Sequence, residues 1–84
     1  VRLPGNTLDM RGMRVDEGME AAEKFFDKAV QNGWERVFLL HGHGTGALKD
    51  GLRHWLRSSG YVADWVPASE EQGGDAFTIV LLGR

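Results

Sequence analysis

Hydrophobic residues recur along one part of the chain with the period of an α-helix. From Val15 onward they return every three or four positions, through Ala22 and Phe26, which places them on one face. Gly33 is the kind of residue that commonly follows the last helical turn. The pattern therefore predicts an amphipathic helix over residues 14–33.

A second stretch has the same helical period. Leu48, Leu52, Trp55 and Leu56 fall on one face of such a helix. The spacing predicts a helix over residues 46–60, which we expect Gly60 to end.

Four other stretches are rich in β-branched, aromatic and aliphatic residues, as strands are. One of them is almost wholly apolar after Arg36, which is typical of a central strand buried on both faces. Residues 68–75 are polar and predict a turn or loop between the last two strands. The predicted strands are residues 7–12, 34–40, 61–67 and 76–82.

The resulting order is β-α-β-α-β-β. Strand–helix–strand units cross over with a right hand and make parallel neighbours, whereas the short last connection predicts an antiparallel pair. Two helices in a chain of 84 residues can cover only one face of the sheet. We therefore predict an α/β fold, a two-layer sandwich with a mixed four-stranded sheet and both helices on one face.

Composition and charge narrow the classes of function. The net charge of −2 and the pI near 5.9 argue against a strongly basic nucleic-acid-binding domain. The cations are clustered, however, because residues 1–14 hold three arginines against one acid, and residues 46–59 hold Lys49, Arg53 and Arg57 against one acid. The chain is therefore acidic overall and basic in two places.

Other features bear on compartment and chain organisation. The sequence has no cysteine, so neither a disulfide framework nor a thiolate zinc site is available. No apolar run approaches the roughly 18 residues of a membrane span, and we expect a cytoplasmic protein with no membrane partner. Because the chain opens on Val1 rather than Met, we expect residues 1–84 to be one domain cut from a longer protein.

Two polar segments are expected to meet in space. Asp9 and Arg11 end the first predicted strand, and the segment from His41 to Gly46 follows the second. If these strands are parallel neighbours, both segments leave the same edge of the sheet, where ligands of open α/β sheets gather.

A nucleotide site and a metal site are two candidate uses of this edge. The glycines 42, 44 and 46 fall one residue short of the dinucleotide fingerprint, and the Lys-Ser/Thr pair of a phosphate loop is missing. His41 and His43 with Asp9 could hold a metal, but no clear fourth ligand is present. We therefore predict no intrinsic metal or cofactor, while Mg²⁺ or Mn²⁺ could still assist a reaction.

A phosphodiester is the ligand that uses all the residues of this edge. His41 can act as a general base or acid, and Arg11 offers a forked donor to a phosphate. Asp9 could orient the imidazole or place a water, although it could also simply pair with Arg11. The glycine-rich loop before the second helix can receive the anion through its backbone. The loop positions are Gly42, His43, Gly44, Thr45 and Gly46.

A row of cations could guide a nucleic-acid strand past this edge. Lys49, Arg53 and Arg57 are spaced four residues apart on the second predicted helix, and Arg14 lies near the first. A solvated helix face with no ligand is an equally good interpretation of this spacing.

The two segments together resemble a known family. Leu8-Asp9-Met10-Arg11-Gly12 and His41-Gly42-His43-Gly44-Thr45-Gly46 are similar, in sequence, order and spacing, to the two motifs of the Smr (small MutS-related) domain. The likeness covers residues 6–83 and is strongest to the C-terminal Smr domain of the Smr-bearing bacterial MutS paralogues. Met10 stands where the family usually has Leu, and His43 stands at a variable position that is often Lys.

The resemblance implies a fold like the C-terminal domain of bacterial translation initiation factor 3, and an endonuclease. Smr domains nick or cut DNA, or cleave RNA in translation quality control. It implies a parent protein that binds ATP, is homodimeric through its other domains, and acts in suppression of recombination or at collided ribosomes. Asp9, Arg11, His41, Gly42 and Gly44 are the family's functional positions.

The expected function is therefore hydrolysis or transesterification of a phosphodiester in DNA or RNA. Asp9, Arg11 and His41 are the expected catalytic residues. Two alternatives remain at this point, a non-catalytic module that binds nucleic acid or the ribosome, and a binder of small nucleotides.

Overall fold

A computed structural model describes residues 6–43, 46–72 and 74–83 of the chain. The order of its elements is the predicted β-α-β-α-β-β, with two short 3₁₀ turns, Glu70–Gln72 and Gly74–Ala76, between the last two strands. The elements are β1 (Thr7–Asp9), α1 (Val15–Gln31), β2 (Arg36–Leu40), α2 (Ala47–Leu56), β3 (Val62–Pro67) and β4 (Phe77–Leu82).

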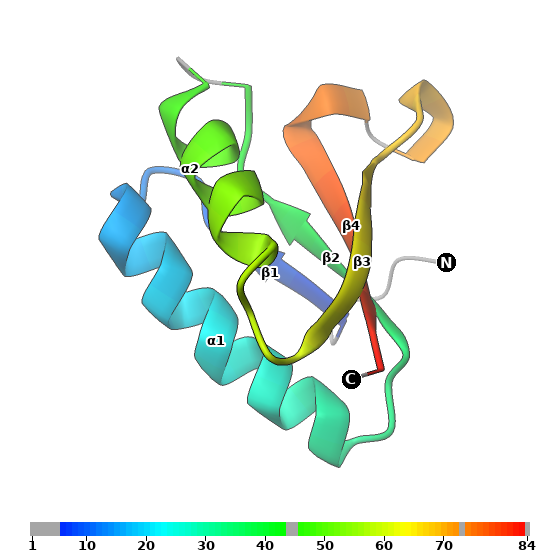
Figure 1. Cartoon of the computed structure of the whole chain (residues 1–84). Helices are drawn as coiled ribbons and strands as arrows, with labels where there is room; N and C mark the ends of the chain where they lie inside the picture. The colour runs from blue at the N-terminus through cyan, green and yellow to red at the C-terminus, as the bar shows by residue number, and fades with distance from the viewer. Residues whose placement is uncertain (1–5, 44–45, 73, 84) are drawn as a thin grey trace.

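The strands form one mixed four-stranded sheet in the order β1-β2-β4-β3. β1 pairs with β2 in parallel, and β4 runs antiparallel to both of its neighbours, β2 and β3. Both helices cover the same face of the sheet (Figure 1). The predicted two-layer α/β sandwich is therefore confirmed, as are the parallel first pair and the antiparallel last pair.

The main core lies between this helical layer and the sheet. Phe26 of α1, Leu52 of α2 and Leu39 of β2 are fully buried in it. Two glycines permit close packing in and beside this core, because a Cβ on Gly18 of α1 would lie 2.9 Å from the Met10 side chain. A Cβ on Gly51 would lie only 2.7 Å from a methyl group of Val15, which explains why α2 carries glycine in its middle.

A smaller apolar cluster occupies the face of the sheet opposite the helices. Phe38, Phe77 and Ile79 form it with the alanines at the two ends of the β3–β4 connection, Ala68 and Ala76. β2 is thus buried on both faces, as its apolar run predicts. Within the described ranges, no helix has both the length and the apolar character that a bilayer crossing requires.

Several predicted boundaries were wrong by two to four residues, each for a local reason. β1 stops at Asp9, because the Asp9 carboxylate accepts the Arg11 backbone N–H at 3.1 Å and starts a turn. β2 starts at Arg36, because the Trp34 N–H still donates to the Ala29 carbonyl in the C-terminal cap of α1.

The second helix is shorter than predicted. α2 ends at Leu56, four residues before Gly60, because Ser58 turns the chain by donating its backbone N–H and its hydroxyl to the Trp55 carbonyl. β4 begins at Phe77, one residue late, since Ala76 belongs to the preceding 3₁₀ turn.

Candidate functional site

The two polar segments meet at one edge of the sheet, as the sequence predicts. Asp9 at the end of β1 is the register partner of Leu40 at the end of β2, and the next N–H, of Met10, donates to the Leu40 carbonyl at 2.8 Å. The aliphatic stem of Arg11 passes so close to Gly42 that a Cβ there would lie 3.3 Å from its Cγ. Gly42 also has a positive φ of 83°, which favours glycine over any other residue.

The loop after β2 is held from the far end of the connection before β4. The backbone N–H groups of His41 and Gly42 both donate to the Ala76 carbonyl, at 3.0 and 3.1 Å. The start of the loop is therefore fixed between β1 on one side and the β3–β4 connection on the other. No local feature of residues 41–42 encodes this contact.

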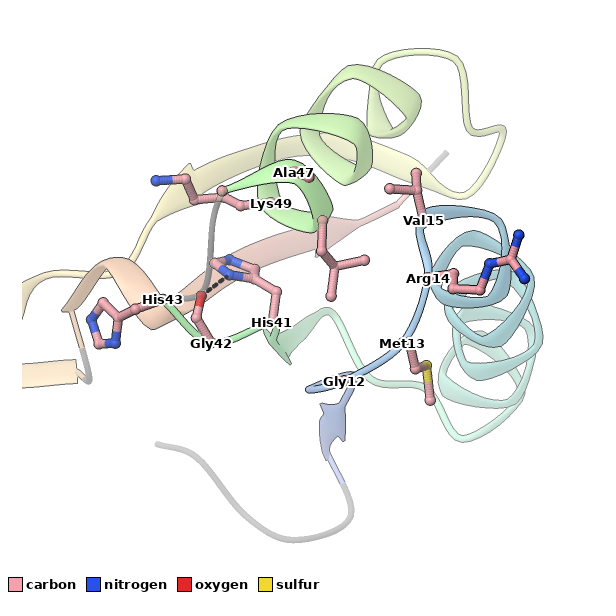
Figure 2. Close-up of a pocket in the computed structure, with 11 residues that line it drawn as sticks. Gly12, Met13, Arg14, Val15, His41, Gly42, His43, Ala47 and Lys49 are labelled. Atoms are coloured by element: carbon pink, nitrogen blue, oxygen red, sulfur yellow. Dashed lines mark hydrogen bonds between the residues drawn. The ribbon is translucent and has the colours of Figure 1, made fainter.

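A cavity of about 260 Å³ opens at this edge. Its walls are the turn from Gly12 to Val15, the start of the glycine-rich loop and the first turn of α2 (Figure 2). α2 begins with Gly46 as its N-cap residue, at a φ of 87°. Because glycine has no side chain, no side-chain oxygen caps the helix there, and the positive end of the helix dipole faces the cavity region.

Asp9 and Arg11 form an exposed, bidentate ion pair. Arg11 donates Nε–H and Nη2–H to the two Asp9 carboxylate oxygens at 2.9 and 2.7 Å. The hydrogen bond from this guanidinium lowers the pKa of Asp9 to about 2, so the carboxylate is charged at neutral pH. Two of the five guanidinium N–H groups are used, and the side chain is 63% exposed.

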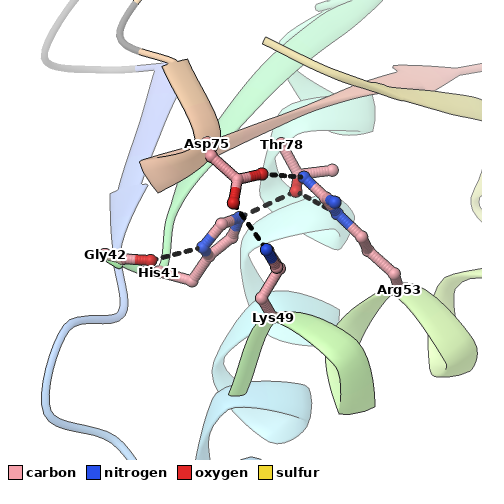
Figure 3. Close-up of polar contacts among 6 residues, drawn as sticks. All are labelled: His41, Gly42, Lys49, Arg53, Asp75 and Thr78. Atoms are coloured by element: carbon pink, nitrogen blue, oxygen red, sulfur yellow. Dashed lines mark hydrogen bonds and ion pairs between the residues drawn. The ribbon is translucent and has the colours of Figure 1, made fainter. Parts of the chain in front are cut away.

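His41 lies in a different environment, at 5% exposure beneath the start of α2. Its Nδ1 lies 3.0 Å from the Gly42 carbonyl oxygen, and its Nε2 lies 2.8 Å from the Thr78 hydroxyl oxygen (Figure 3). Arg53 of α2 donates its Nε–H to the same hydroxyl oxygen at 3.0 Å.

The partners of the ring favour one position for its proton. A carbonyl oxygen only accepts, so Nδ1 of His41 must donate to Gly42. The Arg53 guanidinium only donates, so Thr78 accepts from it and keeps its own proton available for Nε2 of His41. The neutral imidazole with its proton on Nδ1 therefore satisfies all of these contacts.

Electrostatics favour the same neutral form. Burial disfavours the imidazolium and lowers the pKa of His41 below its ordinary value of 6.5. The positive charges of Arg53 and Lys49 act in the same direction, while the Gly42 carbonyl and Asp75 oppose them.

Asp75 links the cations of α2 (Figure 3). Lys49 donates Nζ–H to one Asp75 oxygen at 2.6 Å, and Nη2 of Arg53 lies 3.9 Å from the other. The Arg53 guanidinium also lies over the Trp65 ring, 5.1 Å from its centre. The hydrogen bond from Lys49 lowers the pKa of Asp75, which is therefore anionic near neutrality.

The structure separates Asp9 from His41, although both lie at the same edge. Asp9 shares the face of its register partner Leu40, which packs in the cluster opposite the helices. His41 points to the helical face, where Thr78 lies. The expected orientation of the imidazole by Asp9 is thus wrong in this structure, because Thr78 and Gly42 hold both ring nitrogens.

The expected row of cations on α2 is also not uniform. The Arg53 side chain is only 16% exposed, since Thr78, Trp65 and Asp75 surround its guanidinium. Arg57 is exposed, and Lys49 is 21% exposed at the cavity wall.

The remaining expected residues lie around the cavity. Arg14, Gly42, His43 and Gly46 line it, and Arg14 and His43 lie on opposite sides of His41 in the view of Figure 2. Gly44 and Thr45, two further expected positions, lie outside the described residues.

Sequence reasoning missed Thr78 and Asp75. Thr78 offered a faint signal, since it is a hydroxyl residue inside an otherwise apolar strand and is fully buried. Asp75 offered none, because an acid in a polar loop is ordinary. Among the described residues, no group of three or more His, Asp or Glu side chains lies together as metal ligands would.

Comparisons with known proteins agree with the fold and the motifs. The family model described as "Smr domain" matches residues 8–83, which confirms the resemblance noted in the two motifs. The chain is 46% identical over 77 residues to the Endonuclease MutS2 of Anaeromyxobacter sp. (strain Fw109-5), covering 92% of this chain and 10% of that protein. It is 38% identical over 80 residues to the Endonuclease MutS2 of Streptococcus agalactiae serotype Ia, covering 95% and 10%. The chain therefore spans about a tenth of the length of these relatives.

Solved structures of Smr and small MutS-related proteins also match this chain. The Smr domain of Thermus thermophilus MutS2 matches with a TM-score of 0.90 at 33% identity, covering 94% of this chain and 99% of that chain. YdaL, a stand-alone small MutS-related protein from Escherichia coli, matches with a TM-score of 0.89 over 100% of this chain and 69% of that chain. At 20% identity the second match supports the fold alone.

Proposed function

Because this chain belongs to the Smr domain family, we propose that it is the nucleic-acid endonuclease domain of a MutS-like protein, with a phosphodiester bound in the cavity at the carboxyl edge of β1 and β2. Residues 6–83 form the domain. The printed name of its full-length relatives, Endonuclease MutS2, supports a reaction at a phosphodiester bond.

The observation that carries the proposal is the pair of contacts of the His41 ring, Nδ1 with the Gly42 carbonyl and Nε2 with the Thr78 hydroxyl. Hydrogen bonds from Arg53 to Thr78 and from Thr78 to His41 favour a neutral imidazole. Its Nδ1–H is directed to the Gly42 carbonyl, at the cavity wall. A phosphate oxygen that enters the cavity can replace the carbonyl as the acceptor of this proton. A donor that is already oriented and desolvated stabilises charge that develops on such an oxygen.

This arrangement favours a donor over a general base. The base role would need Nε2 of His41, which Thr78 occupies. Loss of the Nδ1 proton would leave an anionic ring, so the neutral imidazole stabilises the transition state by hydrogen bonding rather than by full proton transfer.

Arg11 and Asp9 form the other half of the proposed catalytic site, next to the cavity rather than in its wall, because the Arg11 stem packs against Gly42, which lines the cavity. Arg11 uses its remaining N–H donors on a non-bridging phosphate oxygen, and Asp9 keeps the guanidinium oriented. Asp9 is charged and exposed, so it can also accept a hydrogen bond from an attacking water. The water adds to phosphorus and gives up one proton to solvent, the bond from phosphorus to the leaving oxygen breaks, and the leaving oxygen takes a proton from solvent.

The surrounding residues bind the rest of the nucleic acid. Gly42 and Gly46 let the backbone approach the anion closely, and Lys49 and Arg14 add positive charge at the cavity wall. His43 and Arg57 are exposed and extend the contact, while Arg53 acts through Thr78 instead of touching the strand. Gly44 and Thr45 complete the loop in this proposal.

Cleavage by two matched variants tests the proposal. His41→Gln keeps an acceptor for Thr78 but loses the Nδ1–H, so we expect about 10²–10³-fold slower single-turnover cleavage with nearly unchanged affinity. His54→Gln, the same change at an exposed histidine that does not line the cavity, should cleave like the parent. The substrates are supercoiled plasmid and single-stranded RNA, each with and without a chelator. Normal cleavage by His41→Gln would contradict the donor role.

A second candidate is a module that binds nucleic acid or the ribosome without cleaving it. Its support is the burial of His41, whose two ring nitrogens are both engaged inside the domain. If the domain and its full-length protein bind both substrates but cleave neither, this module is the correct function. A preference for DNA would favour a role in suppression of recombination, and a preference for RNA a role at collided ribosomes.

A further inference from the structure

Asp75 pairs with Lys49, a cation in the wall of the cavity. Its carboxylate accepts the Lys49 Nζ–H at 2.6 Å, and Lys49 lines the cavity. Carboxylate and phosphate oxygens are interchangeable partners for an ammonium group, so the two compete for the same donor. The Lys49 side chain is 21% exposed, which strengthens the pair compared with a fully solvated one.

Arg53 offers Asp75 a second place to bind. Among the described residues, Nη2 of Arg53 is buried and has no hydrogen-bond partner, and the Asp75 oxygen that faces it is 3.9 Å away. A buried donor without an acceptor is unfavourable, so a short movement of the carboxylate toward Arg53 would satisfy it. Asp75 is 58% exposed and can make this movement without repacking the core.

We propose that Asp75 determines the affinity of the cavity for phosphodiesters, because it competes for Lys49 in the free domain and moves to Arg53 when a phosphate binds. This inference rests on the proposed function. Its consequence is a threshold for binding, since an anion must displace a carboxylate before it gains the charge of Lys49. Inorganic anions with few other contacts are thereby disfavoured against a nucleic-acid strand that also reaches Arg11.

The experiment measures the dissociation constant of a short fluorescent single-stranded DNA, and of an RNA of the same sequence, by anisotropy at low salt. Asp75→Asn should bind both roughly three- to tenfold more tightly than the parent. The matched control is Glu70→Gln, which removes the same charge from an exposed acid of the same connection. It reports the general effect of net charge, and it should give at most a twofold gain, roughly the size of a screened surface charge effect.

A double-mutant cycle shows that the gain comes from Lys49. Lys49→Ala should weaken binding more in the Asp75→Asn background than in the parent, because Asp75 cancels part of the lysine charge only in the parent. Equal losses in the two backgrounds would overturn the inference, since the gain would then come from general electrostatics. A gain no larger than that of Glu70→Gln would overturn it as well.

Two further outcomes separate this inference from the proposed function. If neither the parent nor Asp75→Asn binds either oligonucleotide, the proposed function fails, and the inference fails with it. If the parent binds and Asp75→Asn adds nothing, only the inference fails. Should Asp75→Asn not fold, the movement is tested in the parent by NMR, where a saturating oligonucleotide should shift the guanidinium signals of Arg53. Unchanged Arg53 signals would overturn the inference.

Discussion

The two sides of the site are built in opposite ways. On the β1 side, Asp9 and Arg11 are two residues apart, and their ion pair is exposed at 53% and 63%. On the β2 side, His41 contacts Thr78, which lies 37 positions away in the sequence, and Thr78 in turn contacts Arg53, which lies 25 positions from it. The imidazole is 5% exposed.

The two sides differ in how easily their hydrogen bonds can be exchanged for contacts with a ligand. An exposed ion pair contributes little free energy and is weakened by salt. Arg11 can therefore exchange its hydrogen bonds with Asp9 for hydrogen bonds to a phosphate with little loss of free energy. The His41–Thr78 contact is buried, and its loss would leave Nε2 of His41 without a partner. The β1 side is therefore the adjustable half of the site, and the β2 side is the rigid half.

The largest expected effect comes from breaking the rigid side. Thr78→Val has nearly the same shape but leaves Arg53 Nε and His41 Nε2 without a partner, so we expect a loss of about 1–3 kcal/mol in the free energy of unfolding. Thr7→Val is the matched control, since the Thr7 side chain is half-buried rather than buried and its hydroxyl donates to the adjacent Asn6 side chain at 3.3 Å. Urea denaturation of both variants measures the difference. Equal stabilities would show that the buried chain of donors stabilises nothing.

On the adjustable side we expect a smaller effect, on the affinity for nucleic acid rather than on stability. Arg11→Ala should leave the melting temperature almost unchanged, because the guanidinium is exposed, yet weaken oligonucleotide binding roughly tenfold by removing a charged phosphate donor. Arg36→Ala removes the same charge at the opposite end of β2 and should weaken binding far less. A similar loss for both variants would mean that Arg11 contributes only net charge.

The smallest expected effect is a dependence of stability on pH. Burial lowers the pKa of His41 in the folded state, so on acidification the unfolded chain takes up a proton near pH 6.5 while the folded chain still resists it. The stability contribution of His41 is thus complete above pH 6.5 and falls as the pH is lowered toward the folded-state pKa. An NMR titration of the His41 ring should give a midpoint below 6.5, and urea midpoints of His41→Gln should lack this part of the pH dependence. A midpoint above 6.5 would show that the site favours the imidazolium.

Features that depend on residues close together in the sequence could be predicted, and contacts between distant residues could not. The fold class followed from local patterns, since the period of α1 and the apolar run of β2 depend on neighbouring residues. The meeting of Asp9, Arg11 and His41 at one edge followed from topology, because parallel neighbours end together. The Asp9–Arg11 pair was an open alternative, since residues two apart at a strand end can reach one another.

The face on which each side chain lies could not be predicted without the register. Thr78 reaches His41 only because β4 inserts between β2 and β3, an order that the element sequence leaves open. Asp75 reaches Lys49 across 26 positions through two 3₁₀ turns that appear only as a polar loop in the sequence. Long-range polar contacts of this kind decide the chemistry of the site and leave almost no local signal.

The most direct test of this account is the ¹⁵N spectrum of the His41 ring, recorded with and without a saturating single-stranded oligonucleotide. In the free domain we expect a proton on Nδ1 and none on Nε2, since Gly42 accepts from the first and Thr78 donates to the second. On binding, the Nδ1–H signal should shift as a phosphate oxygen replaces the carbonyl, while the Nε2 signal stays in place. A proton on Nε2, or an Nδ1–H signal that does not move at saturation, would contradict the claim that His41 presents a fixed donor to the phosphodiester.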